Sequence, residues 1–437
     1  MAAQDIARTI NPCLRLEGEI APPGDKSISH RAVILNSIAL GEAEITNFAP
    51  GRDCLSTVSC LKALGVEIRR KGHGNSPTLI FSKSGTDGLR EAGDVLNAGN
   101  SGTTMRLLGG LLSSQPFLSI ITGDASLRNR PMKRLIEPLR LMGAEIYGRG
   151  KDSFAPLVIR GKELSGMDFS LPIPSAQIKS AILLAGLFAQ GSTVLRQPIP
   201  SRDHTERLLK QMGAELGSDG NVISLSPLSS PLVSISFRVP GDISSGAYFL
   251  VAGAIHPDAK LIIKDCGINP TRTGIIDILL AMGARLRIQN KRVEAGEPLA
   301  DIMVESSELK GIRIGGDIIP RLIDEIPALA VAGCIAKGKT VIRDAGELRV
   351  KESDRIATVC RELSRMGAEI EPLPDGMVIH GGKHLAGAEV DSHRDHRLAM
   401  SLAIAGLVAS ERTTIGHAHA AQVSYPFFWQ DLQNLTR

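Results

Sequence analysis

The sequence predicts an α/β protein assembled from six similar units, and three observations support this. Apolar helical stretches rich in small residues are each followed by a polar turn and a β-branched run, as in a helix that leads into a strand. This pattern recurs six times at intervals of about 73 residues, which together fill the 437-residue chain. Hydrophobic residues make up 43% and charged residues 22%, enough to bury a large core and to exclude disorder.

Two kinds of segment define the order of elements inside a unit. In the first, a helix, a polar turn and a strand follow one another, with turns near Gly41, Gln115, Gly191, Asp258, Gly338 and Glu411. In the second, a helix ends on a glycine before a strand, at Gly65, Gly143, Gly213, Gly283 and Gly367. Glycine favours that position because it adopts the left-handed conformation that ends helices. Each unit is therefore predicted as helix, strand, helix, strand, strand, with the sixth unit truncated.

A duplication of higher order divides the six units into two halves. Pro23-Gly-Asp-Lys-Ser opens the first unit and Pro240-Gly-Asp-Ile-Ser opens the fourth. Alternating apolar residues over 14–20 predict a first strand that joins the C-terminal half. The predicted domains are an N-terminal half at 22–240 and a C-terminal half at 1–21 plus 241–437, with three units each.

Charge, aromatic content and cysteine spacing exclude several classes of protein. The 50 basic and 46 acidic residues give a formal charge of +4, too mild for a polybasic binder of DNA or membranes. Aromatic residues make up only 3%, which leaves few platforms for stacking bases. The six cysteines show no Cys-x-x-Cys spacing, and no metal site is predicted. The first residues lack the apolar segment of a secretory signal, so we expect a cytoplasmic protein that binds neither nucleic acid nor membrane.

The first helix of each unit opens on a polar or glycine-containing turn. A helix N-terminus leaves four backbone N–H groups unpaired and carries partial positive charge, which favours bound anions. Basic residues recur at these starts and in nearby loops: Lys26, Arg31, Arg106, Lys179, Arg397, Arg128, Arg130, Arg134, Arg202, Lys351 and Arg355. Together they predict a small ligand with several phosphates or carboxylates. Taken singly, each of these cations has a structural alternative as a solvated charge. Two other residues at helix starts have structural alternatives as well, Ser175 as an N-cap and Asp324 as a first-turn acid.

Eight segments resemble the 5-enolpyruvylshikimate-3-phosphate synthase family: PGDKSISHRA, GNSGTTMRLL, RNRPMKR, PSAQIKSA, SRDHTE, DEIPALAVA, RVKESDR and DHRLAM. They span residues 22–400 in the order of the family. The resemblance implies a two-domain, inside-out α/β barrel-like fold with three βαβαββ units per half, closing over its substrates. It also implies transfer of the enolpyruvyl group of phosphoenolpyruvate to the 5-hydroxyl of shikimate 3-phosphate, with release of phosphate. The resemblance implies no cofactor and no metal, and we expect a monomer.

The resemblance also assigns roles to individual residues. For shikimate 3-phosphate it implies Lys26, Ser27, Arg31, Ser175, Ala176, Gln177, Ser201, Arg202, Asp324 and Lys351. For phosphoenolpyruvate it implies Lys26, Asn100, Gly102, Arg130, Gln177, Arg355 and Arg397. The implied catalytic residues are Asp324, which accepts the proton of the 5-hydroxyl, Glu352, which protonates the methylene carbon, and Lys26, which moves protons.

The sequence resembles one subclass of the family more than others, and it disfavours three rival functions. The segments RPMKR, SAQIK, RDHTE and NPTR are similar to the bacterial subclass with lowered glyphosate sensitivity, and Val423 stands where some members have a lysine. A sister enzyme that transfers enolpyruvyl to UDP-N-acetylglucosamine usually has a reactive cysteine just before its Arg-Pro, which 123–131 lacks. A non-catalytic anion-binding protein is disfavoured because Lys26, Asp324 and Glu352 are all present. An RNA-processing enzyme of related fold needs more stacking residues.

Overall fold

The computed structural model describes residues 7–72, 77–84 and 88–436, which form two compact units. Unit 1 comprises the described residues of Met1–Pro23, Pro240–Val293 and Pro298–Arg437, and unit 2 comprises those of Gly24–Val239 and Glu294–Glu297. The prediction about a secretory signal concerns residues that in part lie outside the described ranges. No helix within the described part of the chain is both long and apolar enough to cross a membrane.

Three four-stranded sheets in unit 2 share one strand order. They are β16(Phe237–Arg238)-β3(Gly41–Thr46)-β5(Thr78–Ser84)-β4(Ile68–Lys71), β6(Leu96–Asn97)-β7(Leu118–Thr122)-β9(Phe154–Arg160)-β8(Glu145–Gly148) and β11(Asp168–Ser170)-β13(Thr193–Arg196)-β15(Val222–Leu225)-β14(Leu216–Asp219). In each sheet the first pair is parallel and the other pairs are antiparallel. A short pair, β10(Leu164–Ser165) with β12(Ala189–Gln190), adds to them. The helices are α1(Lys26–Ser37), α2(Arg52–Ala63), α3(Gly102–Leu112), α4(Lys133–Leu141), α5(Arg149–Asp152), α6(Ala176–Gly186) and α7(His204–Gln211).

Unit 1 repeats this arrangement, and its last sheet has three strands. The sheets are β2(Leu16–Ile20)-β17(Ala259–Gly267)-β19(Glu297–Glu305)-β18(Arg285–Glu294), β20(Arg313–Ile314)-β21(Lys339–Ile342)-β23(Gly376–His380)-β22(Glu369–Leu373) and β24(Glu389–Asp391)-β25(Thr413–Gly416)-β1(Arg8–Ile10). The helices are α8(Ile243–Ile255), α9(Gly274–Ala281), α10(Ile319–Leu322), α11(Ile326–Ile335), α12(Arg355–Arg365), α13(His396–Leu407) and α14(Phe428–Leu435). The predicted repeat is therefore confirmed, including the truncated sixth unit.

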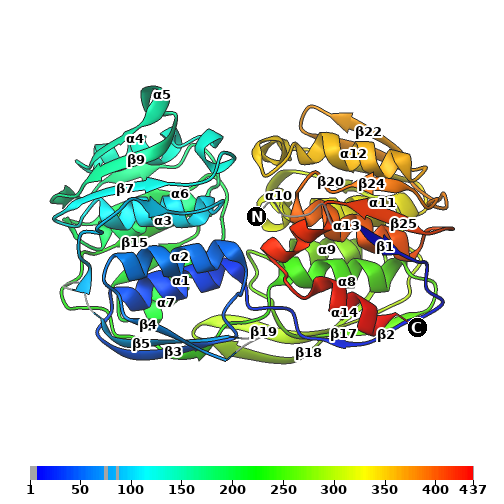
Figure 1. Cartoon of the computed structure of the whole chain (residues 1–437), viewed down its shortest axis with the longest axis horizontal. Helices are drawn as coiled ribbons and strands as arrows, with labels where there is room; N and C mark the ends of the chain where they lie inside the picture. The colour runs from blue at the N-terminus through cyan, green and yellow to red at the C-terminus, as the bar shows by residue number, and fades with distance from the viewer. Residues whose placement is uncertain (1–6, 73–76, 85–87, 437) are drawn as a thin grey trace. The chain divides into compact units, whose positions relative to one another are not determined.

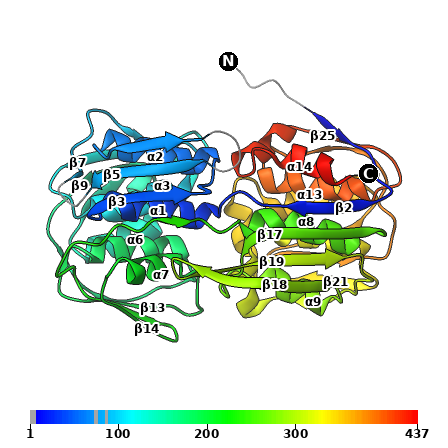
Figure 2. The ribbon, with the colours of Figure 1, turned by 90° about the horizontal axis from the view of Figure 1, so that it is seen from below.

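Local signals in the sequence fall where the pattern predicted them. Five of the six polar turns lie where a helix leads into a strand, as at Gly41, the first residue of β3 after α1. Gly191 lies between the two-residue strand β12, which follows α6, and β13. The five helix-ending glycines all have positive φ, between 83° and 97°. The first long strand, β2, pairs in parallel with β17 of unit 1, and the two lie side by side in Figure 2. This strand begins only at Leu16, where its pairing with β17 begins, and Leu14 before it is 89% exposed.

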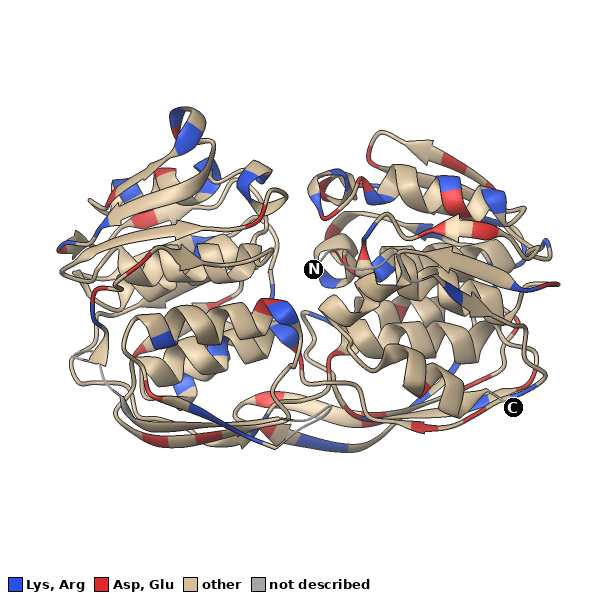
Figure 3. Cartoon of the chain, viewed as in Figure 1, with Lys and Arg blue, Asp and Glu red and all other residues tan. Residues whose placement is uncertain are grey.

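Each unit has its own hydrophobic core, and the first helix of each repeat contributes much of it. All residues of α8 and α13 are buried, as expected for helices that are apolar on nearly every side. The strands bury alternate residues and expose the others, so the sheets cover these helices with one face towards solvent. Figure 1 shows α3 and α6 in the interior of unit 2 and α8, α11 and α13 in the interior of unit 1, and in Figure 3 these helices carry little charge. The fold is the predicted inside-out α/β arrangement.

Candidate active site

In unit 2, side-chain hydrogen bonds join the first two turns of three interior helices. Arg31 of α1 donates from NH2 to Ser180 Oγ of α6 at 2.7 Å. Gln177 of α6 donates from Nε2 to Thr103 Oγ1 of α3 at 2.9 Å and accepts from Arg106 NH1 at 2.5 Å. The N-terminal ends of α1, α3 and α6 therefore lie together. Their partial positive charges and unpaired N–H groups make this corner of the unit attractive to anions.

Lys26 adds a full positive charge to this corner. It is the first residue of α1, and its Nζ forms an ion pair with Asp53 in the first turn of α2. A helix N-terminus disfavours a cation, so the Asp53 carboxylate stabilises Lys26 in this position. The Lys26 side chain is partly exposed, as a substrate-binding group requires, and Ser27 beside it is half-buried.

Arg31 is held by the protein itself in this structure. The side chain is buried, and Nε donates to Thr205 Oγ1 at 2.6 Å while NH1 donates to the Ser27 carbonyl at 2.9 Å. Burial lowers the pKa of Arg31 to about 10, which leaves the guanidinium charged at neutral pH. The residue thus contributes charge to the anion-attracting corner and fixes Ser27.

Three residues predicted for phosphoenolpyruvate lie next to one another in unit 2. Arg130 donates from NH2 to Asn100 Oδ1 at 2.5 Å, and Asn100 donates to Asp124 at 2.7 Å. Gly102 opens α3, and a Cβ atom there would lie 2.8 Å from Arg106 NH1 and 3.5 Å from Arg130 NH1. Two guanidinium groups therefore flank the start of α3, and Gly102 leaves room for them.

The remaining predicted residues of unit 2 lie at the start of α6 and in the loop before α7. Ser175 is the N-cap of α6, so the structural alternative for this residue is realised. Ala176 and Gln177 follow in the first turn, half-buried. Ser201 is buried and its N–H and Oγ both donate to Gln197 Oε1, at 3.1 and 3.0 Å. Arg202, next in the chain, is half-exposed.

In unit 1, one buried guanidinium organises the predicted acidic residues. Arg355 opens α12, and its side chain is 1% exposed. Its Nε donates to Asp395 Oδ2 at 2.8 Å and its NH2 to Glu352 Oε2 at 2.5 Å. Its NH1 lies 3.5 Å from Asp324 Oδ1, while Arg397 NH2 lies 3.7 Å from Asp324 Oδ2. Both predicted catalytic carboxylates are thus brought to Arg355, and Asp324 lies between two cations.

The charges of this cluster stabilise one another despite their burial. Burial opposes ionisation of Asp395, yet its pKa lies below the usual value because the Arg355 charge favours the carboxylate. Burial likewise opposes the charge of Arg397, but Asp324 and other acidic neighbours hold its pKa well above the usual value. The neighbouring His396 behaves differently, since burial and Arg397 lower its pKa to about 4 and keep the imidazole neutral.

Helix starts converge in unit 1 as they do in unit 2. Asp395 caps α13 by accepting from the N–H of Arg397 at 2.9 Å. Glu325, just before α11, is buried and accepts from Ser244 Oγ in the first turn of α8. Lys351 follows the short helix η4(Gly346–Val350) and precedes Glu352, half-buried.

The structure divides the predicted residues between the two units. Unit 2 holds Lys26, Ser27, Arg31, Asn100, Gly102, Arg130, Ser175, Ala176, Gln177, Ser201 and Arg202, and unit 1 holds Asp324, Lys351, Glu352, Arg355 and Arg397. Sequence reasoning missed the structural partners Asp53, Asp124 and Asp395. Asp395 had a visible signal, since an acidic residue two positions before Arg397 is a typical N-cap. Lys179, counted among the ligand-facing cations, is instead fully buried in an ion pair.

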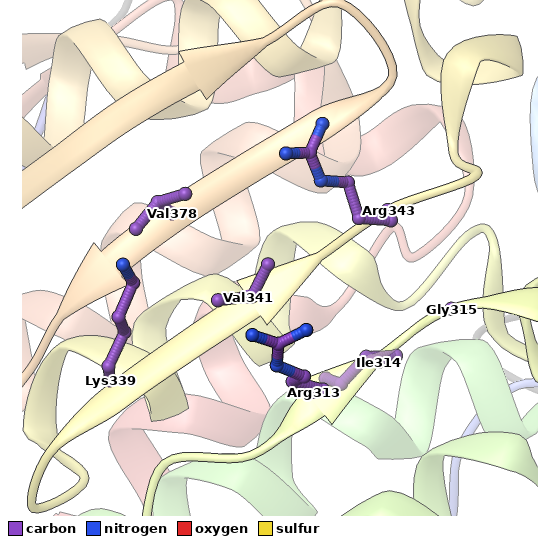
Figure 4. A pocket seen from close by; sticks show the side chains of 7 residues that line it. All are labelled: Arg313, Ile314, Gly315, Lys339, Val341, Arg343 and Val378. Carbon is purple, nitrogen blue, oxygen red and sulfur yellow. The ribbon is translucent and has the colours of Figure 1, made fainter.

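A further cationic pocket in unit 1 contains none of these residues. It has a volume of about 450 Å³ and lies on one face of the β20–β21–β23 sheet (Figure 4). Arg313, Lys339 and Arg343 surround Val341 and Val378, and Arg343 NH1 lies 3.3 Å from Asp375. Exposed cations on a sheet face are ordinary solvated charges, so we do not assign this pocket to the site. Among the described residues, no group of three His, Cys, Asp or Glu side chains could hold a metal ion.

Comparison with known proteins identifies the family. The model of the family described as EPSP synthase (3-phosphoshikimate 1-carboxyvinyltransferase) matches residues 10–432. This chain belongs to the EPSP synthase family. It is 55% identical to a 3-phosphoshikimate 1-carboxyvinyltransferase of Herpetosiphon aurantiacus, covering 97% of this chain and 98% of that protein. The corresponding enzyme of Gloeobacter violaceus is 54% identical, with 98% of both chains covered.

The family also accounts for the fold. A solved EPSP synthase from Acinetobacter baumannii superposes with a TM-score of 0.88 and 44% identity, covering 98% of both chains. The predicted fold class and the predicted membership of the family are confirmed.

Proposed function

We propose that this chain transfers the enolpyruvyl group of phosphoenolpyruvate to the 5-hydroxyl of shikimate 3-phosphate, releasing inorganic phosphate. The product serves the biosynthesis of chorismate and the aromatic amino acids. Family membership over nearly the whole chain supports this assignment, as do full-length relatives that carry the name of this activity. The observation that carries the proposal is that Asp324 and Glu352 both form ion pairs with one buried guanidinium, that of Arg355.

The reaction requires two anions to approach each other. Each substrate carries a carboxylate and a phosphate, and these groups repel one another in water. Fixed cations and helix N-termini offset that repulsion and need no reorganisation during the reaction. We assign shikimate 3-phosphate to Lys26, Ser27, Arg31, Ser175, Ala176, Gln177, Ser201, Arg202, Asp324 and Lys351, and phosphoenolpyruvate to Lys26, Asn100, Gly102, Arg130, Gln177, Arg355 and Arg397.

Proton transfer accounts for the two carboxylates. Asp324 accepts the proton of the 5-hydroxyl while the hydroxyl oxygen attacks C2 of phosphoenolpyruvate, and Glu352 gives a proton to C3. Elimination reverses these roles: Glu352 takes a proton back from C3, the C2–O bond to phosphate breaks, and the proton held by Asp324 leaves with the phosphate, so that an enol ether remains. The guanidinium groups of Arg355 and Arg397 support the carboxylate form of Asp324, the form that a base requires.

Glu352 needs a change of partner before it acts as an acid. Its Oε2 accepts from Arg355 NH2 at 2.5 Å, and this ion pair favours the carboxylate. The carboxylate of phosphoenolpyruvate, bound by Arg355, would compete with Glu352 for that guanidinium. A weakened ion pair allows Glu352 to take up the proton that it delivers to C3. We further propose that Lys26, in the first turn of α1, moves protons in this exchange.

Phosphorus NMR of the reaction mixture tests the proposed chemistry. With both substrates present, the phosphoenolpyruvate signal should disappear as inorganic phosphate appears, while the phosphate ester of shikimate 3-phosphate remains. Proton spectra should show one enol ether for each phosphate released. Phosphate release that does not require shikimate 3-phosphate would indicate a phosphatase and would overturn the proposal.

We infer, in addition, that glyphosate inhibits this enzyme weakly. The segments RPMKR, SAQIK, RDHTE and NPTR support this, together with Val423 in place of the lysine that some members have. The measurement is the inhibition constant in competition with phosphoenolpyruvate. An inhibition constant below the KM for phosphoenolpyruvate would contradict the inference.

A further inference from the structure

A lysine lies entirely inside unit 2, close to the predicted residues. Lys179, in the first turn of α6, is 0% exposed. Its Nζ lies 2.6 Å from Glu206 Oε1 of α7 and donates to the Ser201 carbonyl oxygen at 3.1 Å. Burying an ammonium group is costly, and well-packed apolar residues often replace buried ion pairs without loss of stability. Stability of the core alone therefore gives little reason for a lysine here.

The Lys179 hydrogen bond fixes one peptide group of the loop before α7. The N–H and Oγ of Ser201 both bond to Gln197, so the carbonyl is the remaining polar group of Ser201, and Lys179 holds it. A trans peptide is planar, with its N–H directed opposite to its C=O. By holding the Ser201 carbonyl towards the core, Lys179 directs the N–H of Arg202 the other way.

The same lysine ties this loop to the start of its own helix. Lys179 follows Ser175, Ala176 and Gln177 by two to four residues, which is about one helical turn at most. Both segments are assigned to shikimate 3-phosphate in the proposed function. A single ammonium group therefore sets the loop at Ser201–Arg202 relative to the start of α6.

Glu206, the acidic partner of Lys179, also lies near a second cation, Arg31. Arg31 donates to Thr205, the residue before Glu206, and to Ser180, the residue after Lys179. The charge of Glu206 also stabilises the charged form of Arg31. After loss of the lysine charge, Glu206 would still lie near a second buried cation, Arg31, which reduces the cost of a neutral side chain at position 179.

We propose that Lys179 is a positioning residue for shikimate 3-phosphate, holding the Ser201–Arg202 peptide in the orientation that this substrate requires. The inference rests on the proposed function, because it takes both segments as the binding site of that substrate. Lys179 is buried and makes no contact with the substrate.

The variant Lys179→Met tests the inference. Methionine has a similar length and packs in apolar surroundings, but it donates no hydrogen bond. We expect the Kd for shikimate 3-phosphate, measured by titration calorimetry without phosphoenolpyruvate, to rise about tenfold, as for the loss of one hydrogen bond to a charged group. The KM for shikimate 3-phosphate should rise in parallel, whereas the KM for phosphoenolpyruvate should change less than about twofold.

Two further variants separate positioning from general destabilisation. Leu225→Ala removes a buried side chain of β15 in the same unit without touching the loop, and its Kd for shikimate 3-phosphate should equal that of the wild type. Gln197→Met releases the N–H and Oγ of Ser201 without altering a buried charge, and it should reproduce the selective rise. This variant keeps the inference testable if Lys179→Met does not fold.

The outcomes distinguish this inference from the proposed function. Unchanged binding of shikimate 3-phosphate by a folded Lys179→Met enzyme would overturn the positioning role and leave the function intact. An equal rise in both KM values, or the same loss of affinity in Leu225→Ala, would also overturn it. A wild-type enzyme that neither binds nor consumes shikimate 3-phosphate would overturn both.

Discussion

Replacing Asp395 by asparagine should destabilise unit 1 strongly. The Asp395 side chain is 0% exposed and accepts from Arg355 Nε at 2.8 Å, from Arg355 NH2 at 3.3 Å and from Ser353 Oγ at 3.0 Å. Asparagine keeps the shape and can still cap α13, because its Oδ1 can accept the backbone hydrogen bond. The charge is lost, however, and Arg355 remains buried. Breaking a buried ion pair in this way costs about 3–5 kcal/mol.

The same substitution at Asp354 provides a matched control. Asp354 is the N-cap of α12 and pairs with Arg349 at 2.6 Å, but both side chains of this pair are more than one-third exposed. Exposed ion pairs contribute about 0–1 kcal/mol, so Asp354→Asn should cost no more than that. The two variants share the chemistry of the change and differ in burial.

Urea unfolding followed by tryptophan fluorescence measures the difference. The single tryptophan of the chain, Trp429 in α14, belongs to unit 1, so its signal reports the unit that contains both substitutions. The pKa of Asp395 is depressed, so its contribution is fully present above its unfolded-state pKa and is lost as the pH falls through the folded value. Measurement at pH 7 therefore captures the whole effect. Equal destabilisation by Asp395→Asn and Asp354→Asn would show that burial does not set the cost of losing the carboxylate charge.

Three other predictions address the site and its pH dependence. Glu352→Gln and Lys26→Met should each lower kcat about 10²- to 10⁴-fold in a folded enzyme, and near-normal phosphate release by either would refute its catalytic role. Gly102→Ala places a Cβ 2.8 Å from Arg106 NH1, so Arg106 should shift away from Gln177 and the KM for phosphoenolpyruvate should rise about tenfold; an unchanged KM would show that Arg106 has no such effect. Burial lowers the pKa of His30 to about 3, so its contribution is present above its unfolded-state pKa of about 6.5 and is lost as the pH falls towards 3. Circular dichroism in urea should show that the wild type loses up to about 1.4 kcal/mol per pH unit more than His30→Asn between pH 6 and pH 5, and parallel curves would contradict this.

The repeat and the ends of its helices could be predicted from the sequence, because both depend on the backbone preferences and the hydrophobicity of neighbouring residues. A helix-ending glycine such as Gly143 needs a positive φ whatever surrounds it, and an apolar helix such as α8 must be buried. Pairing across the chain could not be predicted in this way. Asp395 and Arg355 are 40 residues apart, and nothing in either segment alone identifies the other as its partner.

The burial of individual charged side chains could not be predicted from the sequence either. Lys179 lies four residues after the N-cap Ser175, and Lys26 lies one residue after the N-cap Asp25, yet Lys179 is fully buried and Lys26 is partly exposed. Each lysine has a carboxylate partner, Asp53 for Lys26 and Glu206 for Lys179. The sequence does not reveal which face of α7 turns towards α6, so the burial of Lys179 could not be predicted. The motif residues were therefore predictable as a set. The structure was needed to show which charged residues are buried in ion pairs, such as Lys179 and Arg355, and which are partly exposed, such as Lys26.

A coupled assay of phosphate release from phosphoenolpyruvate, run with two alternative acceptors, tests most directly which reaction this enzyme catalyses. Wild-type enzyme should release phosphate with shikimate 3-phosphate and not with UDP-N-acetylglucosamine, and Asp324→Asn should abolish that release although Asp324 and Lys26 belong to different units. Release with UDP-N-acetylglucosamine alone would overturn the proposed acceptor, and full activity of Asp324→Asn would overturn the role of Asp324 as the base.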